Sequence, residues 1–307
     1  MKRRKFIEQS VKAGIYSGAF ISLGKYGNVI ANTVMNDEIP YDLVAVTGGE
    51  PVQMYQRAIN AMGGMQQYVK KGQTVVVKPN IGWDVIPEKG ANTNPNLVGA
   101  IVKSCFEVGA KQVYVFDHTC DEWKKCYQNS KIENAAKEAG AKVVPGNSER
   151  YYEPVDIPQG KKLTSAKVHE LMLESDVFIN VPILKNHGSA KLTIAMKNLM
   201  GIVWDRGYWH RNDLQQCIAD FATWRKPDLN IIDAYNVMMK NGPRGVSEAD
   251  LAKMKFLVMS DDMVAADASA AKIFGMEPAN VPHIEYAHQM GTGNMNLKNQ
   301  NIGRIKI

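Results

Sequence analysis

Short apolar runs alternate with helix-like segments along most of this chain, and that alternation limits the fold more than any other feature. The runs at residues 74–77, 113–116 and 177–179 are rich in β-branched and aromatic residues and are typical of buried strands. Between them apolar residues recur at helical spacing, as in residues 94–109. The pattern predicts an α/β fold in which helices cover a mostly parallel sheet.

The remaining elements are predicted from the same two periodicities. Further strands are expected at residues 42–46, 143–144, 229–232 and 256–259, and further helices at 51–62, 132–139, 167–174, 213–224 and 264–274. One more helix is expected after Gly188, with Leu192, Ala195, Met196 and Leu199 on its apolar face. No repeat or clear linker interrupts residues 36–307, so we expect a single α/β domain there.

The amino terminus is a separate matter. Arg3 and Arg4 stand before Phe6, and a weakly apolar run follows at residues 13–23. That run is too short to span a bilayer but suits the apolar part of an export signal. The paired arginines resemble a twin-arginine signal, which implies export machinery, a periplasmic location and no stable membrane span once the signal is removed. The alternative for residues 1–35 is a disordered basic tail on a cytoplasmic protein.

Composition excludes some classes of protein. The net charge is only +6, and no basic tract with interleaved aromatic residues is present, so we predict no nucleic-acid partner. The four cysteines are Cys105, Cys120, Cys126 and Cys217. They lack the close spacing of zinc or iron–sulfur sites, so no cluster is expected within this chain. Cys120 and Cys126 would pair in an oxidising compartment; four free thiols are the alternative.

Residues 176–205 are the stretch in which we expect a ligand site. It contains no Asp or Glu between its two ends, so Lys185, His187, Lys191 and Lys197 have no local counter-charge. Lys191 and Asn198 are seven residues apart and would share one face of the predicted helix. A basic helix face is often only solvated. Here the cations flank the carboxyl end of a strand, where open α/β sheets bind ligands, so we expect an anionic molecule to complete them.

Polar groups also follow the other predicted strands. They are Lys78 and Asn80, Asp117 and His118, Asp233, and Asp261 and Asp262. If all these strands are parallel, the groups line one edge of the sheet, and together they have the composition of a binding site. The turn at residues 241–245 adds Asn241 and Gly242, because its glycines permit close approach of the backbone to a ligand.

Several blocks carry a family resemblance: residues 77–80, 180–187 and 196–201, Asp233, residues 241–243, and Asp261 and Asp262 with Asp267. Together they resemble the domain-of-unknown-function family 362. The resemblance implies the architecture more than an activity. Many relatives carry a ferredoxin-like four-cysteine module that this sequence does not match, so an iron–sulfur cluster is not carried over. A distant fold-level similarity to the lactate-racemase group, which uses a nickel-pincer nucleotide, is an analogy only.

Individual roles follow from side-chain chemistry. His187 is the candidate acid–base group, with Lys185 beside it, because an unperturbed imidazole titrates near neutrality. Lys185 and Lys197 would hold a carboxylate or phosphate as point charges, and Asn80 and Asn198 would add directed hydrogen bonds. Lys78 and Lys191 are further ligand-binding candidates. Asp233, Asn241 and Gly242 complete the predicted ligand site. If the cofactor is a metal rather than a nucleotide-type molecule, His118 and Asp262 are the candidate ligands, although Asp262 also suits a helix start.

Three functions remain open on these grounds. The first is an exported enzyme that acts on a small anionic molecule. The second is a non-catalytic protein that binds an anionic solute with the same cations. The third is a redox accessory protein without a cluster of its own.

Overall fold

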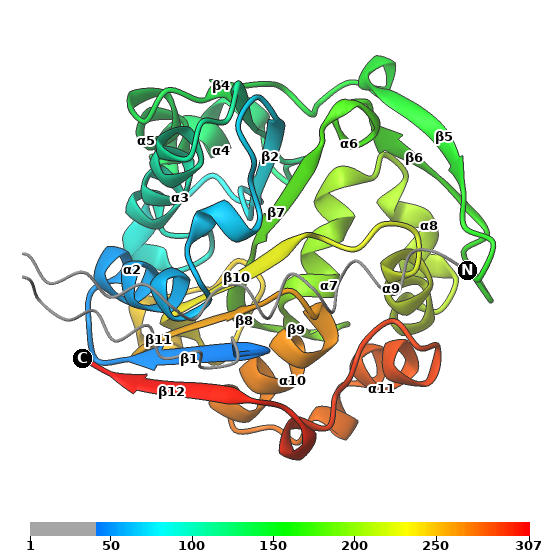
Figure 1. Ribbon diagram of the computed structural model, residues 1–307. Helices are drawn as coiled ribbons and strands as arrows, with labels where there is room; N and C mark the ends of the chain where they lie inside the picture. Colours follow the sequence, from blue (N-terminus) through cyan, green and yellow to red (C-terminus); the bar gives the residue numbers. More distant parts are fainter. Residues whose placement is uncertain (1–40) are drawn as a thin grey trace, which may run out of the picture. The chain divides into compact units, whose positions relative to one another are not determined.

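The described part of the chain, residues 41–307 of a computed structural model, is built on one large twisted sheet (Figure 1). Ten strands form it in the order β12-β1-β11-β10-β7-β2-β3-β4, with β8 paired to β10 and β9 to β8. Neighbouring strands in the block β10-β7-β2-β3-β4 are parallel. Strands β11 and β9 run antiparallel to their neighbours. The predicted α/β fold with a mostly parallel sheet is therefore confirmed.

The bounds of the elements are as follows. The strands are β1 (Leu43–Thr47), β2 (Thr74–Pro79), β3 (Gln112–Val115), β4 (Lys142–Val143), β5 (Tyr152–Asp156), β6 (Ser165–His169), β7 (Val177–Val181), β8 (Ile183–His187), β9 (Lys191–Thr193), β10 (Leu229–Met238), β11 (Leu251–Ser260) and β12 (Ile302–Lys306). The helices are α2 (Pro51–Ala61), α3 (Pro95–Glu107), α4 (Trp123–Asn129), α5 (Ile132–Glu138), α6 (Leu171–Glu174), α7 (Ala195–Asn198), α8 (Arg206–Arg211), α9 (Leu214–Ala222), α10 (Met263–Phe274) and α11 (Pro282–Gln289).

Local signals explain where the long helices begin and end. The Asn94 side chain accepts the N–H groups of Asn96 and Leu97 at the start of α3, and Pro95 occupies its first turn. The Asp262 side chain accepts the N–H groups of Val264 and Ala265 at the start of α10. These caps satisfy N–H groups that have no partner within the helix.

Helices cover both faces of the sheet, which is why the first part of each central strand carries apolar side chains on both faces. Val75 and Val77 of β2 pack in one core with α2, α3, α4 and α5. Val76 packs on the opposite face in a second core with α7, α9, α10 and α11. Because successive side chains of a strand point to opposite faces, a strand buried on both sides has no polar alternation. Polar side chains therefore gather at the carboxyl ends of β2, β3 and β7.

The segment after Gly188 differs from the prediction. The chain passes Pro182 and continues as β8, so Lys185 and His187 lie within a strand, and β9 returns beside it as a hairpin. The helix α7 starts only at Ala195 and continues as the 3₁₀ helix Leu199–Ile202. The predicted shared helix face of Lys191 and Asn198 is therefore wrong. Leu192 is buried in β9, and its apolar character suited a helix and a strand equally well.

Two further predictions are corrected. Strand β11 is antiparallel to both β1 and β10, so Asp261 and Asp262 follow it at the opposite edge of the sheet from Lys78 and Asn80. The helix predicted at residues 167–174 is shorter in the structure. Residues 167–169 belong to β6, which pairs with β5 in a separate two-stranded sheet, and only the short α6 is helical.

The export signal predicted for residues 1–35 lies outside the described residues, so it and the domain boundary at residue 36 stay predictions. Within residues 41–307, no helix combines the length and apolar character that crossing a bilayer requires.

Candidate functional site

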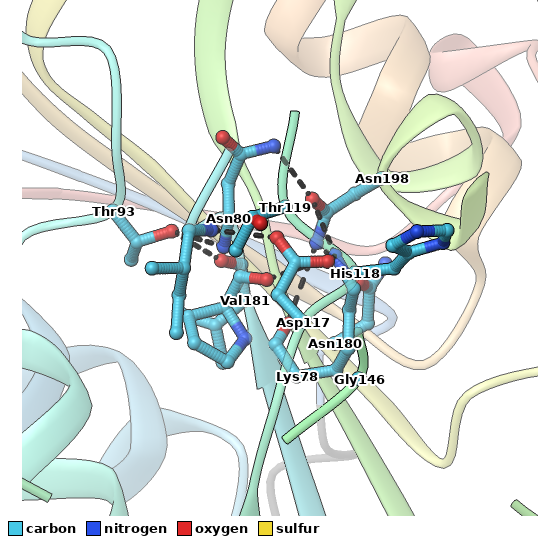
Figure 2. A network of polar contacts seen from close by, with 12 residues as sticks. Lys78, Asn80, Thr93, Asp117, His118, Thr119, Gly146, Asn180, Val181 and Asn198 are labelled. Atoms are coloured by element: carbon cyan, nitrogen blue, oxygen red, sulfur yellow. Dashed lines mark hydrogen bonds and ion pairs between the residues drawn. The ribbon is translucent and has the colours of Figure 1, made fainter. Parts of the chain in front are cut away.

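Lys78, in β2, is the most buried charge of the site. Its side chain is fully buried, and Nζ forms an ion pair with Asp117 Oδ1 at 2.9 Å and donates to Asn198 Oδ1 at 3.0 Å (Figure 2). Burial lowers the pKa of Lys78, and Asp117 opposes that shift. A Cβ at Gly201 would lie 1.8 Å from Asp117 Oδ1 and 2.4 Å from Lys78 Nζ, so glycine is required beside the pair.

A chain of amides joins this ion pair to a second lysine. Asn80 Nδ2 donates to Asn198 Oδ1 at 3.0 Å, and Asn198 Nδ2 donates to Asn180 Oδ1 at 2.9 Å. The remaining Asn80 oxygen accepts from Lys185 Nζ at 3.2 Å. Each asparagine is thus held by partners on both sides, which makes the wall of the site rigid.

Lys185 and Lys197 have no carboxylate partner among the described residues. Nζ of Lys185 donates to Ala91 O and to Asn80, both neutral groups, and the side chain is 1% exposed. Burial lowers its pKa to about 7, and the charge of Lys197 adds to the shift. Burial likewise lowers the pKa of Lys197 to about 8, with repulsion from Arg206 and Lys78. Within residues 41–307, Nζ of Lys197 has neither a hydrogen bond nor an ion pair.

His187, at the end of β8, is held in one tautomer. The N–H of Ala190 donates to Nδ1 at 3.1 Å, so the proton of the neutral ring is on Nε2. Burial lowers its pKa to about 3, with repulsion from Lys197 and Lys185. No described residue is bonded to Nε2. The imidazole is therefore neutral at physiological pH and presents an N–H donor.

These side chains line one cavity with two parts. The inner chamber, of about 60 Å³, is lined by Lys78, Asn80, Asp117, Lys185, His187, Lys197 and Asn198, among others. The adjoining vestibule, of about 600 Å³, is lined by Trp83, Trp204, His210 and α8 residues. Among the lining residues of the inner chamber, four are basic (Lys78, Lys185, Lys197 and Arg206) and one, Asp117, is acidic. Since Asp117 already pairs with Lys78, the chamber has an excess of uncompensated positive charge.

The sequence was compared with known proteins. The family model described as "Domain of unknown function (DUF362)" matches residues 75–272. The chain belongs to this family. Thylakoid-associated protein sll1697 of Synechocystis sp. is 25% identical over 241 residues, which cover 76% of this chain and 73% of that protein. The lactate racemase apoprotein of Thermoanaerobacterium thermosaccharolyticum is similar in structure at a TM-score of 0.49 and 12% identity. That match covers 75% of this chain and 56% of the racemase chain.

In this DUF362 chain, seven of the twelve predicted site residues line the inner chamber. They are Lys78, Asn80, His118, Lys185, His187, Lys197 and Asn198. His118 lies at the rim, where its Nδ1 is 2.9 Å from Val203 O and its ring stacks on Trp204. This hydrogen bond is to a backbone carbonyl, and Asp117 pairs with Lys78 instead, so the two neighbours do not form a carboxylate–histidine pair.

Other predicted residues support the site without lining it. The buried Asp233 carboxylate accepts the N–H groups of Asn94 and Tyr235, and burial raises its pKa to about 6. The N–H of Gly242 donates to Asn186 Oδ1, and a Cβ there would lie 1.9 Å from Asn186 O. The turn therefore packs closely on β8, while Asn241 donates to Asp250.

Lys191 and Asp262 lie away from the cavity. Lys191 is exposed in the β8–β9 hairpin, at a φ of +67°. Asp262 caps α10 and accepts the Asn294 N–H at 2.7 Å, at the opposite edge of the sheet. His118 and Asp262 therefore do not form a joint metal site. Among residues 41–307, no group of three or more His, Cys, Asp or Glu is arranged to hold a metal ion.

Three residues of the cavity were missed as site residues by sequence reasoning: Asp117, Cys120 and Arg206. Asp117 stood out only as a strand-end group, and its pairing with Lys78 depends on two strands lying side by side. Arg206 and Cys120 are in loops or short helices, where periodicity gives no signal. All four cysteines are free, and Cys120 is the exposed one.

Proposed function

We propose that this protein binds a small anionic molecule in the inner chamber, with Lys185 and Lys197 as its cationic partners. The observation that carries the proposal is Lys197, whose ammonium group lines the chamber without a partner in the described residues. Lys197 is partly buried, so its ammonium group loses part of its hydration without a protein group in return, and this costs free energy. A bound anion beside Nζ offsets that cost.

The shape of the cavity suits a ligand with an anionic head and a larger body. A chamber of about 60 Å³ has room for a carboxylate or phosphate group, since one water needs roughly 10–15 Å³ of such space. The Nε2–H of His187 is available as a neutral donor to an anion oxygen. The body of the ligand would extend into the vestibule, between walls that include Trp83 and Trp204.

A second candidate function is acid–base catalysis on that anion, and Lys185 favours it. A lysine with a pKa of about 7 can both give and take a proton near neutral pH. His187 is less suited to act as the base, because its Nε2 already carries a proton and its pKa is about 3. A binding protein and an enzyme would share the same anion site.

The test begins with the ligand. Native mass spectrometry of protein purified from its own host identifies any retained anion. Calorimetric titration with sulfate and malonate then compares wild type, Lys197→Met and Lys191→Met, which remove the same charge inside and outside the cavity. We expect binding to be weakened only in Lys197→Met. Equal affinities in all three proteins would refute the proposed site.

We also propose, from the sequence alone, that the chain is exported to the periplasm by the twin-arginine route. Replacing Arg3 and Arg4 by lysine keeps the charge and should leave the protein in the cytoplasm. Fractionation of cells that express both forms tests this, and unchanged periplasmic arrival would disprove it.

A further inference from the structure

Cys120 lies where the inner chamber opens into the vestibule, and it lines both. The backbone holds it there: its N–H donates to Gly82 O at 2.8 Å. Arg206 donates to the carbonyls of His118 and Thr119 at 2.8 and 2.7 Å, and its Nη1 is 3.7 Å from the Cys120 sulfur. The thiol is therefore both positioned and accessible, whereas the other three cysteines are buried.

The lysines that share the chamber with this sulfur are the two without a carboxylate partner, Lys185 and Lys197. Cys120 lines the inner chamber together with Lys185 and Lys197, and its sulfur raises the pKa of both lysines. The sulfur thus shares a small chamber with two ammonium groups that have no carboxylate partner. An anionic reagent that reaches the thiol would be attracted by both lysines.

A second observation points to a ligand beside the thiol. The His187 ring is 9% exposed and lines the same chamber, with Nε2–H bonded to no described residue. Nε2 is not among the fully buried atoms without a partner, so this N–H opens to the chamber and is available to an oxygen of a ligand.

We infer that Cys120 is the nucleophile of a covalent site for small carboxylates that have a leaving group on the carbon next to the carboxylate. The inference rests on the proposed function, because Lys185 and Lys197 are the groups that would hold the carboxylate. In the reaction the thiol proton passes to water and the sulfur attacks the neighbouring carbon. The sulfur–carbon bond forms as the bond to the leaving group breaks, and the leaving group departs with the electron pair. No oxidant or reductant is needed.

Two alkylating probes test the inference. Iodoacetate and iodoacetamide deliver the same kind of carbon to sulfur with loss of iodide, and they differ in the carboxylate. The rate of alkylation at Cys120 is followed by peptide mass spectrometry in the folded full-length protein. The same cysteine in the urea-unfolded chain provides the intrinsic ratio of the two rates. Lys197→Met and the matched Lys191→Met separate the effect of the cavity charge from that of net charge.

We expect the iodoacetate-to-iodoacetamide ratio at Cys120 to be about tenfold higher in the folded than in the unfolded protein, the change that one nearby charge can produce. Lys197→Met should reduce the iodoacetate rate and leave the iodoacetamide rate nearly unchanged, and Lys191→Met should change neither. Sulfate should slow iodoacetate labelling.

Other results overturn the inference. A folded ratio equal to the unfolded one, or a Cys120 that neither probe labels, excludes a selective nucleophile. If sulfate still binds in calorimetry under that outcome, the anion site stands and only the covalent role fails. If sulfate and malonate do not bind either, the proposed function fails with it.

Discussion

Lys78 and Lys197 both line the inner chamber, and they differ in what surrounds their ammonium groups. Lys78 is fully buried, paired with Asp117 and hydrogen-bonded to Asn198. Lys197 is less buried and has no partner in residues 41–307. The first lysine completes a neutral network that joins β2 to the loop after β3 and to α7. The ammonium group of Lys197 is left without a partner, so it is available to a bound anion. The comparison divides the cavity into a structural half, formed by Lys78 with its partners, and a ligand-binding half that contains Lys197.

The largest expected effect comes from breaking the structural half. Lys78→Met leaves the buried Asp117 carboxylate without its counter-charge, and we expect the free energy of unfolding to fall by about 3–5 kcal/mol. Urea unfolding at pH 7 measures it. The double variant Lys78→Met/Asp117→Leu, which leaves no unpaired charge, should recover much of the loss. A loss below about 1 kcal/mol, the range of exposed pairs, would mean that the ion pair is not structural.

The next effect is on binding. Lys197→Met should weaken malonate or sulfate binding by about 1.5–3 kcal/mol, the range for hydrogen bonds to charged groups. Its melting temperature without ligand should equal or exceed that of wild type, because an unpartnered ammonium group is removed. Calorimetry and thermal melts check the two parts, with Lys191→Met as the control for charge. A variant that binds normally but melts far earlier would make Lys197 structural, like Lys78.

The sequence predicted the two halves unequally. Lys78, Asn80, Lys185 and His187 could be placed together because parallel strands bring their carboxyl ends to one edge. The pairing of Lys78 with a counter-charge could not be predicted, since its partner Asp117 lies in the loop after β3.

Local patterns also failed in identifiable ways. Lys191 was misplaced because residues 188–194 fit a helix by apolar spacing, whereas the hairpin β8–β9 satisfies their backbone in the structure. The position of Asp262 was predicted wrongly because the residues of β11 do not indicate that this strand runs antiparallel to its neighbours. Cys120 was considered only as a possible disulfide partner of Cys126, and nothing in the sequence placed it in the ligand site.

A smaller effect is expected on the pH dependence of malonate binding. Lys185 and Lys197, with pKa values of about 7 and about 8, are protonated below those values, and an anion binds the protonated forms. Malonate affinity should be full below about pH 7 and fall as pH rises to 9.5, by at most about tenfold per unit for each lysine. Binding at pH 8 should take up protons, which calorimetry in buffers of different ionisation enthalpy detects. A pH-independent affinity would exclude both lysines.

The contribution of these two lysines to the free energy of unfolding should change with pH in the opposite direction to the malonate affinity. The ordinary lysine pKa is 10.5, so between about pH 7 and 10.5 the unfolded chain holds more protons at these two positions than the folded chain does. Their contribution to stability therefore rises with pH in that window. The difference in unfolding free energy between wild type and Lys185→Met/Lys197→Met isolates it.

The smallest effect concerns His187, where two substitutions separate its two nitrogens. His187→Asn keeps an acceptor near Nδ1 for the Ala190 N–H and removes the donor at Nε2. His187→Gln places an amide N–H near Nε2 and leaves the Ala190 N–H without its acceptor. If Nε2–H donates to the bound anion, Asn should weaken malonate binding by about 0.5–1.5 kcal/mol with little change in stability, and Gln should do the reverse. Because the His187 pKa is about 3, neither effect should vary between pH 5 and 7. Asn and Gln variants that bind alike would show that His187 only holds the β8–β9 hairpin, and would place it with Lys78 in the structural half.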